Sequence, residues 1–161
     1  MSATLADVVE VARAVAHRGK QGGRLFTYKG HVFDLDELGA CSKFVRQVYE
    51  AAQGLPEDAL KTSNGGYFAC CAAATEAQLK ALKLNVPLAS PGAIVCFNDP
   101  PSGKHCKWCG RQVGHIGIFL GKGEFAENTS GHRGPGTTIS KLTDDNIVAR
   151  ISGRYEPLKA Q

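Results

Sequence analysis

The sequence contains no long hydrophobic run. Its apolar stretches fall well short of the roughly 20 residues that a transmembrane helix needs, so we expect no membrane span. The N-terminal residues 1–7, Met-Ser-Ala-Thr-Leu-Ala-Asp, also lack the basic and then apolar plan of a signal peptide. We therefore expect a chain that is cytosolic, is delivered by another route, or has been trimmed.

A strong charge of either sign is also missing. Nineteen Lys and Arg residues against 15 Asp and Glu residues leave a formal net charge of +4. So small an excess suits an anionic polymer as a partner, but it is too weak to indicate nucleic acid binding. A hydrophobic content of 43% and a charged content of 21% are ordinary for a folded domain and argue against disorder.

Internal repeats, linkers and a separate binding module are absent too, so the 161 residues are expected to form one domain, 1–161. Helical periodicity comes first and strand patterns follow, which predicts an α+β fold. A glycine-rich loop between the first two helices is expected to carry Tyr28. We expect helices over 5–19, 40–52 and 72–82, and strands over 93–97, 114–120, 124–129, 137–141 and 147–155.

Among the six cysteines, Cys41 has the most telling position. Phe44, Val45 and Val48 recur at helical spacing, which predicts an amphipathic helix with Cys41 in its first turn. A thiol there faces unpaired backbone N–H groups and the positive end of the helix dipole, and both favour the thiolate. The pattern therefore predicts a cysteine nucleophile, although a cysteine on a helix can also be inert core packing.

A histidine far downstream completes the chemistry. His115 stands at the start of a predicted strand, and Ile116, Ile118 and Leu120 occupy the opposite face. A lone strand histidine is more often structural than catalytic. A cysteine at a helix start combined with a histidine on a strand nevertheless indicates a thiolate–imidazolium pair.

Four segments resemble an NlpC-type bacterial cell-wall cysteine peptidase, which belongs to a papain-like family with the CHAP-type amidases as near relatives. They are 26–30 (FTYKG), 40–45 (ACSKFV), 90–97 (SPGAIVCF) and 114–125 (GHIGIFLGKGEF). The family usually has Asp before and Gly after its Cys-Ser pair, whereas this chain has Ala40 and Lys43. The missing acid makes the surroundings of Cys41 more positive, which favours the thiolate.

The resemblance implies a papain-like fold in which N-terminal helices, including the nucleophile helix, pack on a C-terminal antiparallel β-sheet. It implies a cysteine peptidase or amidase that hydrolyses amide bonds in peptidoglycan stem peptides, with no cofactor. Cys41 would be the nucleophile and His115 the proton carrier. The Tyr28 hydroxyl would share the oxyanion with the Cys41 backbone N–H.

A third polar residue would orient His115, and two neighbours compete for this role. Glu127 lies twelve positions after His115, as in the family, whereas Asn128 is a residue type that papain-like sites often use. Adjacent strand side chains face opposite ways, so only one can point at the imidazole. The spacing favours Glu127, and a bulge before Ser130 would favour Asn128 instead.

The loop before His115 contains a C-x-x-C pair, Cys106 and Cys109, and the only tryptophan, Trp108. One such pair is half a zinc site, and it would need Cys96, His105 or Cys70 to complete it. Free thiols or a labile disulfide are favoured, so no metal is predicted. We expect the loop to form a rim of the substrate cleft.

Two other classes of function remain open. A different papain-like thiol enzyme, such as a deamidase or an acyltransferase, would keep Cys41 and His115 but spare stem peptides. A non-catalytic binding domain, stapled by zinc or a disulfide at Cys106 and Cys109, would leave Cys41 buried and inert. The scissile bond, any inhibitor and any fused partner do not follow from the sequence.

Overall fold

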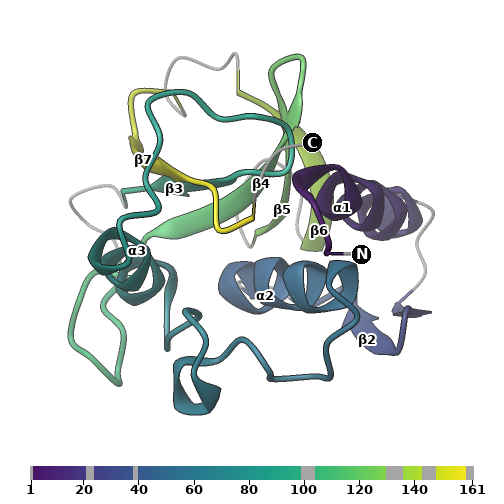
Figure 1. Cartoon of the computed structure of the whole chain (residues 1–161), viewed down its shortest axis with the longest axis horizontal. Helices are drawn as coiled ribbons and strands as arrows, with labels where there is room; N and C mark the ends of the chain where they lie inside the picture. Colours follow the sequence, from purple (N-terminus) through teal and green to yellow (C-terminus); the bar gives the residue numbers. More distant parts are fainter. Residues whose placement is uncertain are drawn as a thin grey trace.

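The structure, a computed structural model, describes residues 2–20, 24–37, 40–98, 104–129, 136–142 and 148–158. Within these ranges the fold is α+β, with helices early in the chain and an antiparallel sheet late in it (Figure 1). The helices are α1 (Leu5–Lys20), α2 (Cys41–Ala52) and α3 (Ala72–Ala81), with a short 3₁₀ helix η1 (Thr62–Asn64). None of the helices in the described ranges is long and apolar enough to cross a membrane.

The main sheet has five strands in the order β6-β5-β4-β3-β7, and every neighbouring pair is antiparallel. Antiparallel neighbours need only short connections, which agrees with the close spacing of the predicted strands. The strands are β3 (Ile94–Phe97), β4 (His115–Gly121), β5 (Glu124–Thr129), β6 (Gly136–Lys141) and β7 (Ile151–Tyr155).

The main hydrophobic core lies between α1, α2 and one face of this sheet. Val45 and Val48 of α2 are buried in it together with Ile116 and Ile118 of β4. The apolar positions of α2 recur at helical spacing and those of β4 alternate, so both elements present one continuous apolar face. In Figure 1, α2 runs along the sheet, and this helix begins near strands β4 and β5.

A two-stranded sheet, β1 (Leu25–Tyr28) and β2 (His31–Asp34), stands where the Tyr28-bearing part of the glycine-rich loop was predicted, while the glycines at 22–23 lie outside the described residues. Its turn consists of Lys29 with φ of 49° and Gly30 with φ of 81°. Two left-handed residues in a row match the twist of a tight hairpin. The prediction of a loop here was wrong because Lys at the first turn position carries no strong hairpin signal. Tyr28 therefore lies on a strand.

One further expectation, the start of the last strand, needs correction. Another, a bulge before Ser130, falls outside the described residues. The last strand begins at Ile151, because residue 148 is helical and residues 149–150 form a turn, and residue 147 is not described. The pairing of β5 with β6 runs without a register shift from Glu124 to Thr129. A bulge before Ser130 would lie beyond that point, outside the described residues.

Candidate active site

Cys41 is the first residue of α2, and its side chain lies at the edge of the core with 6% of the residue exposed. Ala40 precedes it as the N-cap residue, and within the described part of the chain no side chain caps this helix end. The first N–H groups of a helix have no partner inside the helix, and they carry the positive end of its dipole. The fold thus places the Cys41 thiol at a helix start where backbone N–H groups have no partner inside the helix.

His115 is the first residue of β4 and is held by a carboxylate from the next strand. Its Nε2 atom lies 2.5 Å from Oε1 of Glu127, whose side chain is fully buried on β5. The Phe97 ring packs beside the imidazole, with 5.7 Å between the ring centroids. The ring is therefore fixed in position by one polar and one aromatic neighbour.

Cys41 acts on the same imidazole. Because Glu127 takes Nε2, Nδ1 is the ring nitrogen that remains for an interaction with the thiol. Burial alone would lower the pKa of His115, but the hydrogen bonds with Cys41 and Glu127 and the charges of both raise it to about 9. The imidazole is then a cation at neutral pH, between two groups that can be anions.

Asn128 does something other than orient the histidine. Its Oδ1 atom accepts from the Ala40 backbone N–H at 2.8 Å, and its Nδ2 atom donates to the Glu37 carbonyl at 2.7 Å. A weaker bond of 3.3 Å runs from Nδ2 to the Thr137 hydroxyl. The two neighbouring residues on β5 therefore have different roles, since Glu127 contacts the imidazole and Asn128 holds the backbone that leads into α2.

Tyr28 is not brought to the other predicted residues. Its ring packs against Phe26, with centroids 5.7 Å apart, and the Lys29 ammonium lies 5.8 Å from the ring centroid. Among the described residues no contact of Tyr28 with Cys41 or His115 is found, and Tyr28 does not line the cleft described next. Its role as an oxyanion donor stays a prediction.

A cleft of about 440 Å³ opens beside Cys41. One side is formed by Ala40, Cys41 and Ser42 at the beginning of α2, and the other by the loop before β4. Trp108 of that loop is 76% exposed and lines the cleft, as predicted for a rim. Cys41 lines the cleft and His115 does not, so a ligand in this cleft would contact Cys41 rather than the imidazole.

Four cysteines gather on the rim. The sulfur atoms of Cys70, Cys71, Cys106 and Cys109 all lie within 4.8 Å of one another. Hydrogen bonds from the backbone N–H groups of Trp108 and Cys109 lower the pKa of Cys106 to about 7. The sequence offered Cys70 as one possible partner of the C-x-x-C pair. The sequence did not place Cys71 in the site, although its position next to Cys70 is a signal that could have drawn attention to it. Cys96, which the sequence offered as another partner, is not in the group.

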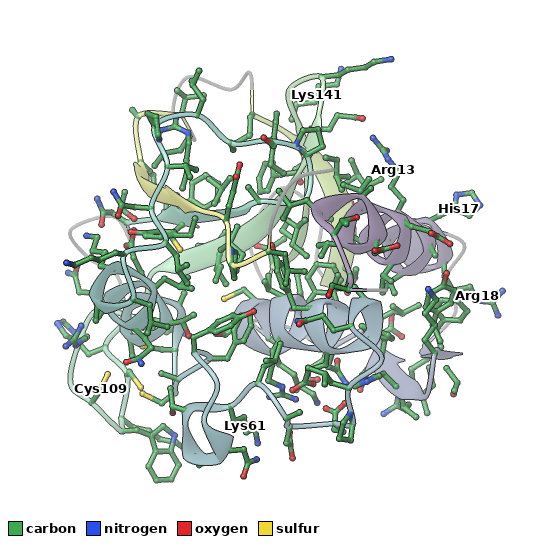
Figure 2. All side chains as sticks on the ribbon, in the orientation of Figure 1. Arg13, His17, Arg18, Lys61, Cys109 and Lys141 are labelled. Atoms are coloured by element: carbon green, nitrogen blue, oxygen red, sulfur yellow. The ribbon has the colours of Figure 1, made fainter. Side chains whose placement is uncertain are left out.

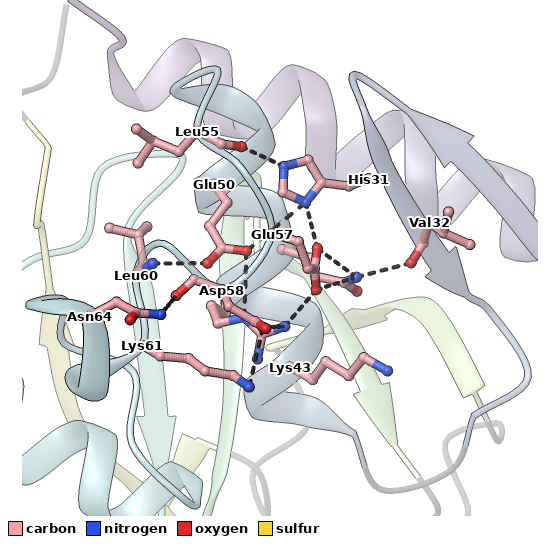
Figure 3. Close-up of polar contacts among 12 residues, drawn as sticks. His31, Val32, Lys43, Glu50, Leu55, Glu57, Asp58, Leu60, Lys61 and Asn64 are labelled. Atoms are coloured by element: carbon pink, nitrogen blue, oxygen red, sulfur yellow. Dashed lines mark hydrogen bonds and ion pairs between the residues drawn. The ribbon is translucent and has the colours of Figure 1, made fainter.

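A second histidine–carboxylate pair was not predicted from the sequence (Figure 3). The ring of His31 on β2 is 1% exposed, its Nδ1 lies 2.7 Å from Oε2 of Glu57, and its Nε2 lies 2.7 Å from the Leu55 carbonyl. Arg46 binds the other oxygen of Glu57 at 2.7 Å. Burial raises the pKa of Glu57, but hydrogen bonds from His31, Gln47 and Arg46 outweigh it, so the pKa is lowered.

His31, Glu50 and Glu57 also have the donor types of a metal site and lie close enough together for one. Their atoms already have partners in the chain, however. Glu50 accepts from the Leu60 backbone N–H at 2.9 Å, and Arg46 places a cation against both carboxylates. A metal ion would have to displace these bonds, so we read this group as a structural network.

No family model matches the chain, and no curated protein matches it. Among solved structures, an NlpC/P60 family protein from Bacillus cereus aligns with a TM-score of 0.47 and 18% identity, over 91% of this chain and 40% of its own. A structure described as similar to lipoprotein, NLP/P60 family, from Staphylococcus aureus aligns with a TM-score of 0.47 and 14% identity, over 92% and 42%. The chain thus spans about two fifths of the length of either structure.

Proposed function

We propose that this chain is a cysteine peptidase or amidase that cleaves amide bonds through an acyl-enzyme on Cys41. One observation carries the proposal, namely the His115 imidazole, which the buried Glu127 carboxylate holds at 2.5 Å and whose pKa is raised by Cys41 and Glu127 together. A thiol at a helix start, a histidine with a raised pKa and an anion behind it are the three parts that a papain-like mechanism needs.

In the acylation step, the Cys41 thiolate attacks the carbonyl carbon of the scissile amide, and the carbonyl oxygen becomes an oxyanion. The Cys41 backbone N–H at the start of α2 is one donor to this oxyanion, and the helix dipole adds to its effect. When the intermediate collapses, the C–N bond breaks and His115 gives its proton to the leaving amine. A thioester on Cys41 and a neutral imidazole remain.

In the deacylation step, neutral His115 takes a proton from water as the water attacks the thioester carbonyl. The C–S bond then breaks and releases the carboxylic acid, and Cys41 returns as a thiolate beside an imidazolium. Glu127 holds the ring in one orientation and stabilises its positive charge in both steps. The carboxylate is not required to take up a proton.

We propose peptidoglycan stem peptides as the substrate, and the support for this finer statement is the resemblance of segments 26–30, 40–45, 90–97 and 114–125 to NlpC-type peptidases. A net charge of +4 suits an anionic wall polymer. A cleft of about 440 Å³ with an exposed Trp108 on its rim has room for a short peptide.

The test is digestion of purified peptidoglycan, with the released fragments identified by mass. We expect the wild-type chain to release fragments with new amino and carboxyl ends, and Cys41→Ala to release none. Cys96→Ala is the matched control, because it removes another buried thiol, on β3, that has no part in the proposed steps. Equal release by wild type and Cys41→Ala would refute the proposal.

A second measurement separates the peptidase from other thiol enzymes. A wild-type chain that releases no fragment, yet forms a covalent adduct on Cys41 with an acyl-donor probe, would move the activity to a deamidase or acyltransferase. A chain that does neither would leave Cys41 as a buried structural residue.

A further inference from the structure

The four cysteines on the rim come from two segments that are far apart in the chain. Cys71 is the N-cap residue of α3, and its sulfur accepts from the Ala74 backbone N–H at 3.4 Å. Cys70 immediately precedes it. This end of α3 therefore holds two sulfurs, and helical N–H groups point toward one of them.

The second pair is held by a short hairpin. His105 pairs with Gln112, and the Cys106 N–H donates to the Arg111 carbonyl at 2.7 Å. At the tip, the Gly110 N–H donates to the Cys106 carbonyl at 2.8 Å, and Gly110 has a φ of 75°. This tight turn brings the sulfurs of Cys106 and Cys109 to the same side.

The hairpin is docked on the helix by the backbone. The Ala73 N–H in the first turn of α3 donates to the Val113 carbonyl at 2.8 Å. This bond joins the stem of the hairpin to α3 within two residues of Cys71, and it accounts for the meeting of the two cysteine pairs. In Figure 2, Cys109 lies just below α3, on the loop that passes beneath that helix.

The spacing of the sulfurs fits a single metal ion. In a tetrahedral zinc site with Zn–S distances of about 2.3 Å, neighbouring sulfurs lie about 3.8 Å apart. The Cys71 and Cys109 sulfurs are 3.8 Å apart, and all four lie within 4.8 Å of one another. A disulfide needs sulfurs about 2.05 Å apart, so this separation matches shared ligation better than a bond.

We propose that Cys70, Cys71, Cys106 and Cys109 bind one Zn²⁺ ion as a tetrathiolate structural site. Soft thiolate ligands in a tetrahedral arrangement select zinc among the common divalent ions. Four thiolates in one place repel one another, and the ion removes that cost while four thiol protons are released. All four ligand positions are filled by protein, so the ion has no open position for substrate and is not catalytic.

The ion would determine the shape of the cleft. Cys70, Cys71 and Cys106 line it together with Trp108, opposite Cys41. Zinc would tie the start of α3 to the hairpin tip and so fix the distance between Trp108 and the nucleophile. It would also protect the Cys106 thiolate from alkylating agents. This inference does not depend on the proposed peptidase activity.

The first test measures metal directly. The chain is purified under reducing conditions and without chelator, and its zinc content is determined by mass spectrometry of the elements. We expect one zinc per chain. After exchange with Co²⁺, we expect the intense visible absorption and the sulfur-to-metal charge-transfer bands of tetrahedral cobalt thiolate. Protein that contains no zinc and gives no such spectrum with added Co²⁺ would overturn the proposal.

The second test assigns the ligands. Cys109→Ser removes one ligand at the exposed tip and should weaken zinc binding by at least about 100-fold, beyond the 10- to 100-fold cost of losing an outer partner. Cys96→Ser is the control, a buried cysteine outside the cluster that should keep one zinc per chain. Equal zinc contents in the two variants would contradict the assignment.

A third measurement uses the wild-type chain, so it still decides the question if Cys109→Ser fails to fold. It also distinguishes zinc binding from disulfide formation. A chelator added to wild-type protein should lower its melting temperature, and added zinc should restore it. Intact mass before reduction should show all six cysteines as free thiols. A mass lower by two hydrogens for each of one or two disulfides in protein kept from air would replace the metal site with a redox staple.

Discussion

Within the described ranges, two largely buried histidines each contact a carboxylate, and the pKa of one of them, His115, also responds to a thiol. His115 and Glu127 approach to 2.5 Å, and His31 and Glu57 approach to 2.7 Å. Both histidines are largely covered, with side-chain exposures of 13% and 1%. Judged by this distance and burial alone, either pair could belong to a catalytic centre.

The second ring nitrogen separates them. In His31 it bonds to the Leu55 carbonyl, so both nitrogens face acceptors and neither is left for a nucleophile. Arg46 also binds the Glu57 carboxylate and neutralises it. In His115 only Nε2 meets the carboxylate, and the pKa of the ring responds to Cys41, which lines a cleft. A histidine–carboxylate pair thus becomes a candidate for chemistry only through what its other nitrogen meets.

The sharpest way to break this comparison is to remove the reacting groups. We expect Cys41→Ala and His115→Ala to show only background hydrolysis, since neither the nucleophile nor the proton carrier has a substitute. His31→Ala should keep the wild-type kcat per folded molecule. Turnover of peptidoglycan, normalised to the folded fraction by circular dichroism, is the measurement. Near-normal turnover by His115→Ala would exclude the cysteine–histidine mechanism.

The next largest difference in kcat is expected between variants of the two carboxylates, Glu127 and Glu57. Glu127→Gln keeps the shape but loses the negative charge that orients the imidazolium, so kcat should fall by about tenfold to 10⁴-fold while activity stays measurable. Glu57→Gln, the matched change in the other pair, should leave kcat within about twofold, because it affects folding and not the reacting atoms. Similar kcat values for the two variants would show that Glu127 does not orient His115.

The two histidine–carboxylate pairs should also lose their contributions to stability at opposite ends of the pH range. The pKa of His115 is raised from 6.5 to about 9, so its contribution to stability, on the order of 3 kcal/mol, is complete below pH 6.5 and is lost as the pH rises through 9. The pKa of Glu57 is lowered, so its smaller contribution is present above pH 4.5 and is lost in acid. Urea unfolding of wild type, His115→Gln and Glu57→Gln across this range measures both effects. A constant difference between wild type and His115→Gln from pH 6 to 10 would contradict the first.

The smallest expected effect concerns stability alone. His31→Leu leaves the Leu55 carbonyl without its donor and removes one of the donors to Glu57, which keeps Arg46 and Gln47. This should cost about 1–3 kcal/mol of unfolding free energy. The cost stays moderate because Glu57 is 42% exposed and can turn toward water. Asn128→Ala should cost a similar amount, since it frees the Ala40 N–H and the Glu37 carbonyl. Denaturant titration checks both, and no change in either would mean that these networks are not formed in solution.

Much of the frame could be predicted from local patterns. The start of α2 followed from the spacing of Phe44, Val45 and Val48, and the alternation of adjacent strand residues separated Glu127 from Asn128. Both arguments use only positions within one element or on one strand, where geometry is fixed by the backbone. The preference for Glu127 as the residue facing His115 agrees with the 2.5 Å contact.

The rest depended on contacts between segments far apart in the chain. The partners of His31 come from α2 and from the turn after it, and nothing in the spacing of His31, Arg46 and Glu57 indicates that they meet. Cys71 joins Cys106 and Cys109 only because a backbone bond docks the hairpin on α3. The sequence pointed to Asn128 only as a possible orienting residue for His115, whereas it fastens the entry to α2.

Strand β5 limits the sequence changes that this chain can accept in evolution. Glu127 sets the histidine and Asn128 sets the helix that begins with the thiol, so one peptide bond fixes the separation of two reacting groups that come from distant parts of the sequence. Side-chain substitutions around the sheet can be absorbed one at a time. A single residue inserted or deleted within 124–129 would turn both side chains to the wrong faces at once. We therefore expect this strand to tolerate no change of length, even where the loops beside it vary freely.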